Sequence, residues 1–175
     1  MATSDGATSP SGEQQLVITR SFDAPRELVW KAFTEADRLA QWWGPKGFTM
    51  LAGALDFRPG GVFHYAIRAP DGHTVWGRFV YREIQPPERI VFVNSFADEE
   101  GNIIRAPFSP AWPLEILNTV TFTEAGGKTI VTLRGGPINA TEEERDTFWT
   151  MRESVQQGFA GTFDQLDAYL AEAQR

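Results

Sequence analysis

The chain has 175 residues, of which 42% are hydrophobic and 22% charged, and this suits a globular domain with a hydrophobic core of its own. Its formal net charge of −7 argues against a general binder of nucleic acid, because phosphate backbones attract basic surfaces. The absence of cysteine excludes disulfide bonds, thiolate nucleophiles and cysteine-ligated metals.

The first residues differ in composition from the rest of the chain. Residues 1–13 are rich in Ser, Thr, Gly and Ala and have neither the basic start nor the apolar run of a secretion signal, so we expect a disordered tail. No segment approaches the roughly 18 apolar residues of a membrane-spanning helix. We therefore expect a single domain over residues 14–175 and a cytoplasmic location.

A strand and two short helices are expected at the start of this domain. Residues 14–22 alternate apolar and polar side chains, as a strand does. Asp23 then suits the cap of a helix whose first turn holds Pro25. A second short helix follows and ends at Gly44-Pro45, because glycine and proline stop the helical pattern.

From residue 48 the pattern becomes that of an antiparallel meander, in which glycine- and proline-containing turns separate β-rich runs. Pairing Thr123 with Lys128 in the last hairpin places Val120 opposite Val131. The six predicted strands span about 48–57, 61–69, 74–85, 88–97, 112–123 and 128–135. With the first strand they make a mostly antiparallel sheet of seven strands.

Two parts of this region are less regular. A two-residue turn at Asp71-Gly72 brings Phe63 beside Val80, but both faces of this hairpin carry apolar residues, so a bulge or the opposite orientation stays open. The segment 98–111 contains two prolines and no clear period. We expect it to form a long loop of the kind that covers a binding site.

The longest helical pattern runs from Thr141 to about Leu170. Thr141 and Glu144 match a capping box, which marks the helix start. At roughly 1.5 Å per residue the helix would be about 45 Å long. Its apolar stripe, which needs a covering surface, consists of Phe148, Met151, Val155, Phe159, Phe163, Leu166, Tyr169 and Leu170.

The order of strand, two short helices, six-stranded meander and long last helix resembles the helix-grip fold. The motifs that agree include Phe22-Asp23-Ala24-Pro25, Trp42-Trp43-Gly44-Pro45, Arg58-Pro59-Gly60-Gly61, Gln85-Pro86-Pro87-Glu88-Arg89 and Gln157-Gly158-Phe159. Over about residues 14–171 the chain is similar to the SRPBCC superfamily (START-like, birch-pollen-allergen-like), and within it to the bacterial group named after the activator of the heat-shock-protein-90 ATPase.

The resemblance implies an α+β fold in which a curved seven-stranded sheet wraps the C-terminal helix, with an internal cavity between them. Where that family usually has Gly-Trp in the last helix, this chain has Gly158-Phe159, which keeps an aromatic contact but changes the shape of the cavity. Six tryptophans and thirteen phenylalanines would suit the lining of a pocket. The alternative is a solid aromatic core.

Polar residues on inward faces are candidates for contacts with a ligand. Asn94 and Asn118 can orient a carbonyl or hydroxyl, or can bond to the backbone or to trapped water. Arg152 lies beside the helix stripe, where it can hold an acidic ligand or can pack its stem and reach solvent. Arg78, which would share a face with Tyr65, has the same two interpretations.

Two glycines interrupt the last helix, at a cost of about 1 kcal/mol each relative to alanine. Gly158 and Gly161 either allow the close approach of backbone or a loop, or leave room for a ligand. The residues expected to line the cavity are Trp43, Phe63, Tyr65, Trp76, Arg78, Asn94, Trp112, Leu114, Asn118, Met151, Arg152, Val155 and Phe159.

No motif indicates a metal site, a cofactor or a catalytic centre. His64 and His73 are the only histidines and lack a matching carboxylate pattern, so we expect no metal ion. There is no Gly-x-Ser-x-Gly elbow, P-loop or Gly-x-Gly-x-x-Gly sequence. Catalysis by a lone pocket carboxylate such as Asp56 or Glu83 stays open but is not indicated.

Three functions are therefore carried forward. We expect a module that encloses a small hydrophobic or amphipathic molecule between the last helix and the sheet. The first alternative, implied only by the resemblance, is a protein-interaction domain that regulates a chaperone ATPase. The second is an enzyme of the cyclase or hydrolase type that uses the cavity to fold its substrate.

Overall fold

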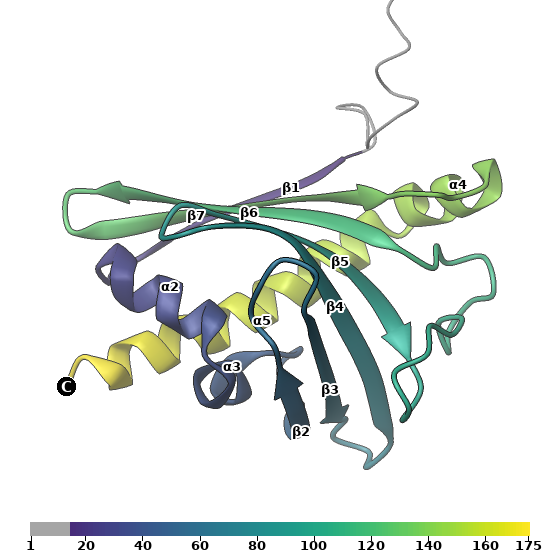
Figure 1. Cartoon of the computed structure of the whole chain (residues 1–175), viewed down its shortest axis with the longest axis horizontal. Helices are drawn as coiled ribbons and strands as arrows, with labels where there is room; N and C mark the ends of the chain where they lie inside the picture. Colours follow the sequence, from purple (N-terminus) through teal and green to yellow (C-terminus); the bar gives the residue numbers. More distant parts are fainter. Residues whose placement is uncertain (1–14) are drawn as a thin grey trace, which may run out of the picture.

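The computed structural model describes residues 15–175, and the predicted tail over residues 1–13 lies outside this range. The described chain forms seven strands and four helices (Figure 1). In chain order these are β1 (Leu16–Phe22), α2 (Arg26–Thr34), α3 (Ala36–Trp42), β2 (Thr49–Leu55), β3 (Val62–Arg68), β4 (Thr74–Gln85), β5 (Arg89–Ala97), β6 (Ile116–Ala125), β7 (Lys128–Pro137), α4 (Glu142–Thr150) and α5 (Arg152–Ala173).

The strands form one antiparallel sheet in the order β1-β7-β6-β5-β4-β3-β2. Strands β2 to β7 are neighbours in chain order, as in the predicted meander, and β1 pairs with β7. Figure 1 shows the sheet bending around α5, with α2 and α3 on the same side as that helix. These features confirm the predicted α+β helix-grip fold.

The β6–β7 hairpin has a register two residues away from the prediction. Val120 lies opposite Leu133 rather than Val131. The cause is the turn, since Gly126 and Gly127 have φ values of +60° and +83° and form a two-residue loop of the type that requires positive φ at both positions. Because the shift is even, Val120 still faces the core, where it is fully buried.

The β3–β4 hairpin is displaced by one residue from the predicted register. Phe63 pairs with Phe79 rather than Val80, because the loop holds three residues and ends in Gly72 at φ +97°. A shift of one residue exchanges the faces of a strand. Phe79 therefore faces the core, and the ring of Trp76 stacks on the outward-facing His64 at 4.9 Å between centroids.

The predicted single helix over 141–170 is in fact two helices. The capping box of Thr141 and Glu144 starts α4 as predicted. The chain leaves helical geometry at Met151, whose ψ is 9°, and α5 begins at the next residue. The guanidinium of Arg152 donates to the carbonyl of Trp149 at 2.7 Å, and a side chain that takes a helix carbonyl in this way is a recognised cause of a break.

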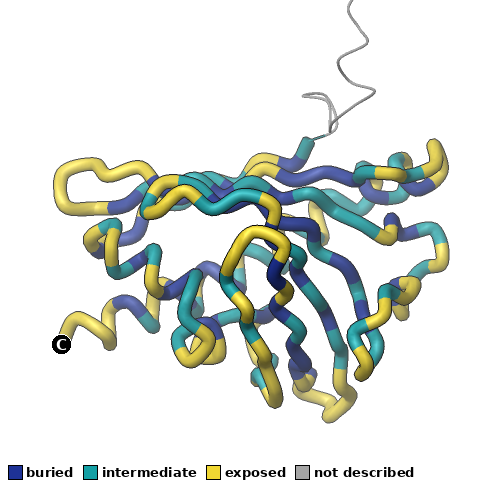
Figure 2. The backbone as a smooth tube through the Cα atoms, in the orientation of Figure 1, coloured by how far each residue is buried: buried dark blue, intermediate teal, exposed yellow. Residues whose placement is uncertain are grey.

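Figure 2 marks the buried residues along the chain, and those that form the hydrophobic core belong to two clusters. The larger cluster joins the inner face of the sheet to α2, α3 and the second half of α5, where Phe163, Leu166 and Leu170 are almost completely buried. The smaller cluster lies at the other end of the molecule and consists of Leu16, Ala106, Trp112 and Phe148, with Met151 and Val155 packed against it. The first half of α5 therefore runs between two packed regions.

Candidate functional site

A pocket of about 620 Å³ lies between these two clusters. Its walls come from the segment after α3, strands β3 to β5, the start of β6, the loop before β6 and the first half of α5. The lining residues are Trp43, Gly44, Pro45, Phe48, Tyr65, Ile67, His73, Val75, Trp76, Gly77, Asn94, Ser95, Phe96, Pro107, Phe108, Trp112, Pro113, Ile116, Met151, Ser154, Val155, Gly158, Phe159 and Thr162.

Hydrogen bonds hold the segment after α3 against α5. The buried hydroxyl of Thr162 donates to the carbonyl of Gly44 at 3.0 Å, and the amide of Gln165 donates to the same carbonyl at 2.6 Å. A Cβ at Gly161 would lie 3.4 Å from Lys46, so glycine permits the close approach of the two segments there. This arrangement places Trp43 at the edge of the pocket.

The second helix glycine has a different environment. A Cβ added at Gly158 would meet no atom within 4 Å, and Gly158 lines the pocket. Close packing against protein therefore explains Gly161 but not Gly158. At Gly158 the missing side chain enlarges the open space beside α5.

The loop between β5 and β6 forms an aromatic wall of the pocket. Phe96 contacts Phe108 at 5.7 Å between ring centroids, Phe108 contacts Trp112 at 5.4 Å, and Trp112 contacts Phe148 of α4 at 5.5 Å. Phe108 is 52% exposed although it is a large apolar residue. It therefore stands at the border between the pocket and solvent.

An ion pair ties this loop to α4. Arg105 donates from one nitrogen to the Glu144 carboxylate at 2.5 Å and to the Trp112 carbonyl at 3.3 Å. The other carboxylate oxygen accepts from the backbone N–H of Thr141 at 3.0 Å. The Arg105 hydrogen bond is the main reason why the pKa of Glu144 lies below its ordinary value. One carboxylate thus caps α4 and positions the wall of the pocket.

A small polar group interrupts the apolar lining. The hydroxyl of Tyr65 lies over Gly77, where an added Cβ would come within 2.5 Å of its oxygen. Burial raises the pKa of Tyr65, while hydrogen bonding to Trp43 and Asn94 opposes this rise. The amide nitrogen of Asn94 also donates to the carbonyl of Arg78 at 3.2 Å, which holds it in place.

Eight of the thirteen predicted cavity residues lie around this pocket. They are Trp43, Tyr65, Trp76, Asn94, Trp112, Met151, Val155 and Phe159. The other five, Phe63, Arg78, Leu114, Asn118 and Arg152, do not line it. Each of these five has a structural reason for its position.

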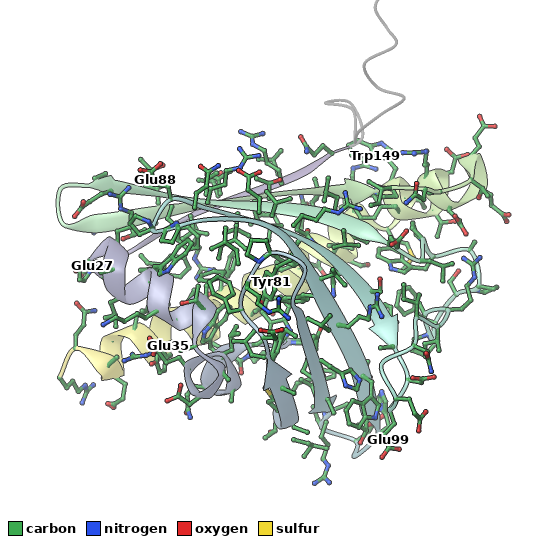
Figure 3. The ribbon with its side chains drawn as sticks, viewed as in Figure 1. Glu27, Glu35, Tyr81, Glu88, Glu99 and Trp149 are labelled. Atoms are coloured by element: carbon green, nitrogen blue, oxygen red, sulfur yellow. The ribbon has the colours of Figure 1, made fainter. Side chains whose placement is uncertain are left out.

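The two arginine candidates, Arg78 and Arg152, donate to backbone carbonyls outside the pocket. Arg78 lies on the outward face beside His64 and donates to the carbonyl of Gly101 at 2.9 Å, a position that follows from the one-residue shift of the β3–β4 register. Arg152 donates to Trp149 and stacks over its ring at 4.4 Å, near the end of the molecule at which Figure 3 labels Trp149. The helix break at Met151 removes Arg152 from the stripe predicted for one continuous helix.

The remaining three lie in the core or in solvent. Phe63 is fully buried and stacks against Tyr65 behind the pocket. Asn118 faces inward but lies over Gly135, with its amide 3.5 Å from the Ile116 carbonyl. Leu114 precedes β6 and is exposed, whereas the prediction began that strand at residue 112.

Some lining residues were not among the predicted candidates. Gly77 carried a usable signal, because glycine inside a strand often marks a place where another group approaches closely. Phe48, Ile67, Val75 and Phe108 carried none that separates a pocket wall from ordinary core or loop. Their roles depend on the hairpin register and the path of the loop.

The chain was then compared with known proteins. Residues 23–171 match the family model described as activator of Hsp90 ATPase homolog 1-like protein. The chain belongs to this family. No protein of curated function matches it. The match also confirms the resemblance to the bacterial SRPBCC group noted from the motifs.

Solved structures of the same fold come from several bacteria. Protein Ms6760 from Mycobacterium smegmatis is 30% identical, with 90% of each chain covered and a TM-score of 0.74. A protein from Staphylococcus epidermidis is 27% identical, with 95% of this chain and 94% of that chain covered and a TM-score of 0.71. One from Arthrobacter aurescens is 25% identical, with 91% and 87% covered and a TM-score of 0.77.

Two further observations concern the described residues. No helix within residues 15–175 is long and apolar enough to cross a membrane. In the same part of the chain, no group of three or more His, Asp or Glu side chains is placed to hold a metal ion.

Proposed function

We propose that this protein binds a small, largely apolar molecule in the pocket between the first half of α5 and the sheet. The observation that supports this most directly is Gly158, which lowers helix propensity by about 1 kcal/mol and has no atom near its missing side chain. A close-packed interior normally fills such space. A pocket of about 620 Å³ also lies within the range of small-molecule sites, roughly 300–1,000 Å³.

The chemistry of the lining agrees with an apolar ligand. Apart from Trp76, whose ring stacks on the outward-facing His64, seven lining residues are aromatic, from Trp43 at one edge to Trp112 and Phe159 at others. Aromatic rings bury large apolar areas and favour offset or edge contacts with other rings. The family description raises regulation of a chaperone ATPase as the alternative function.

Blocking the pocket tests the proposal. A panel of lipids, flavonoids and polyketide-like molecules is screened by native mass spectrometry and by tryptophan fluorescence, since Trp43 and Trp112 line the pocket. Gly158→Phe places a ring in the open space without removing any contact, so we expect it to weaken binding of a hit at least about tenfold, a loss of about 1.4 kcal/mol.

The matched control adds the same ring elsewhere on the same helix. Ala168 is an exposed residue of α5 outside the pocket lining. Ala168→Phe should therefore leave the affinity unchanged. Equal affinity of Gly158→Phe and the unmodified protein for every hit, or no hit at all from the panel, would count against a ligand in this pocket.

A further inference from the structure

We infer that the ligand is uncharged and carries a hydrogen-bond-accepting oxygen, such as that of a ketone, which it places against the hydroxyl of Tyr65. This inference rests on the proposed function, because it assigns a chemistry to the occupant of the same pocket. It excludes fatty acids and other anions as the preferred ligands.

The position of Tyr65 is specifically built. Its phenol extends over β4, and this is possible only because residue 77 is glycine: an added Cβ would lie 2.5 Å from the hydroxyl oxygen and 2.6 Å from the carbon that bears it. The ring is fixed on one side by stacking on Phe63 at 4.9 Å between centroids. The edge of Phe79 contacts it at 5.6 Å.

The polar side chains beside the Tyr65 hydroxyl leave its hydrogen without an acceptor. Trp43 and Asn94 oppose the rise in the pKa of the phenol that burial causes, as N–H groups directed at its oxygen do. The indole N–H of Trp43 can only donate. The Asn94 amide nitrogen is also a donor, and it donates to the Arg78 carbonyl at 3.2 Å. Among the described residues no acceptor lies within hydrogen-bond distance of the Tyr65 hydroxyl, so its hydrogen remains for an acceptor in the pocket that Tyr65 lines.

The absence of ionic groups in the lining determines the charge of the ligand. None of the lining residues within the described chain is Lys, Arg, Asp or Glu. His73 at the rim is exposed and its ring contacts the carboxylate of Asp71 at 2.5 Å. A buried charge without a partner is strongly disfavoured, whereas a neutral carbonyl needs only one hydrogen bond.

Three probes with one aromatic skeleton test this chemistry. Acetylanthracene is the ketone, ethylanthracene has nearly the same shape without oxygen, and anthracene carboxylate has the charge. Their intrinsic fluorescence reports binding by anisotropy. The measured quantity is the change in affinity for each probe on Tyr65→Phe, because this comparison cancels differences in water solubility between the probes.

Tyr65→Phe should weaken binding of the ketone by about five- to tenfold, the size of one net hydrogen bond, and leave the hydrocarbon unchanged. Infrared spectroscopy gives an independent readout: the carbonyl band of bound acetylanthracene should lie at lower frequency in the unmodified protein than in Tyr65→Phe. The carboxylate should bind most weakly of the three at pH 8.

Tyr81→Phe is the matched control. Tyr81, labelled inside the fold in Figure 3, has a buried hydroxyl that does not line the pocket and has no hydrogen-bond partner among the described residues. The same change there should affect none of the three affinities. The melting temperature of Tyr81→Phe should stay close to that of the unmodified protein, which would show that loss of a buried hydroxyl is tolerated.

The outcomes separate the two proposals. If ketone and hydrocarbon bind, Gly158→Phe blocks both, and Tyr65→Phe affects neither or both equally, the inference is wrong and the proposed function stands. Binding of the carboxylate as tight as that of the ketone also overturns the inference. If Gly158→Phe lowers the affinity for none of the probes, the pocket is not the binding site and both proposals fail.

Discussion

At the scale of single residues, three glycines show how one missing methyl group can serve different purposes. Gly161 allows Lys46 to approach α5, Gly77 allows the Tyr65 phenol to lie over β4, and Gly158 adjoins only open space. The helical pattern alone predicted that Gly158 and Gly161 had a purpose but could not separate contact from empty space. That distinction depends on where other segments pass.

Adding a methyl group at two of these glycines should have opposite effects on stability. Gly158→Ala should raise the free energy of unfolding by up to about 1 kcal/mol, because alanine favours the helix and meets no atom. Gly77→Ala should lower it by about 1–3 kcal/mol, because the new Cβ collides with Tyr65. Urea unfolding monitored by circular dichroism measures both values. A destabilising Gly158→Ala would show that its space is filled.

At the scale of elements, the loop before β6 and α4 act together through Glu144. Its carboxylate joins the cap of α4 to Arg105, and Arg105 in turn holds the carbonyl of the pocket residue Trp112. The capping box was predicted from the spacing of Thr141 and Glu144. The ion pair was not, because Arg105 lies in a loop whose path has no sequence periodicity.

The lowered pKa of Glu144 makes a prediction about acid stability. A carboxylate whose pKa is lower in the folded than in the unfolded chain adds stability above the unfolded pKa, and this is lost as the pH falls through the folded value. Arg105 and the Thr141 N–H lower this pKa from its ordinary 4.5. Glu144→Gln should therefore be less stable by about 1 kcal/mol at pH 7, and the difference should shrink below about pH 4.5.

Urea midpoints measured between pH 3 and pH 7 would show this difference. Glu143→Gln is the control. Glu143 is an exposed neighbour of Glu144, and this substitution removes the same charge near the helix start without affecting Arg105. Its effect should be smaller and should not follow the same pH profile. A constant gap between Glu144→Gln and the unmodified protein at all pH values would show that the ion pair has no effect.

At the scale of the whole molecule, hydrophobic alternation and turn signals were enough to predict the sheet, the helix order and the inward face of β6, on which Val120 and Phe122 are buried. These signals were insufficient to predict the strand register. The register depends on the length of each hairpin loop, and the positive φ values of Gly72 and Gly126 that determine it are not visible in the pattern of apolar residues. The predicted site residues were affected most by these local errors in the backbone. A shift of one residue moved Arg78 to the outer face, and the break at Met151 turned Arg152 away.

The division of the core predicts that the molecule does not open uniformly. The smaller cluster has four buried residues against 21 in the larger one, and its members Ala106, Trp112 and Phe148 come from α4 and the loop beside the pocket. Segments with less buried apolar surface open at lower free energy. Amides of α4, such as that of Phe148, should therefore exchange hydrogen faster than those around Leu166 in α5, as measured by hydrogen–deuterium exchange with mass spectrometry.

A pocket ligand should reduce this difference. It would contact Trp112 and Val155, which pack within or against the smaller cluster, and would thereby stabilise that end of the molecule by mass action. Saturation with a hit from the panel should slow exchange in α4 and in the loop, while β6 and β7 stay unchanged. Gly158→Phe gives the reference for a filled pocket without ligand. Equal exchange in both halves, with or without ligand, would show that the two clusters open as one unit.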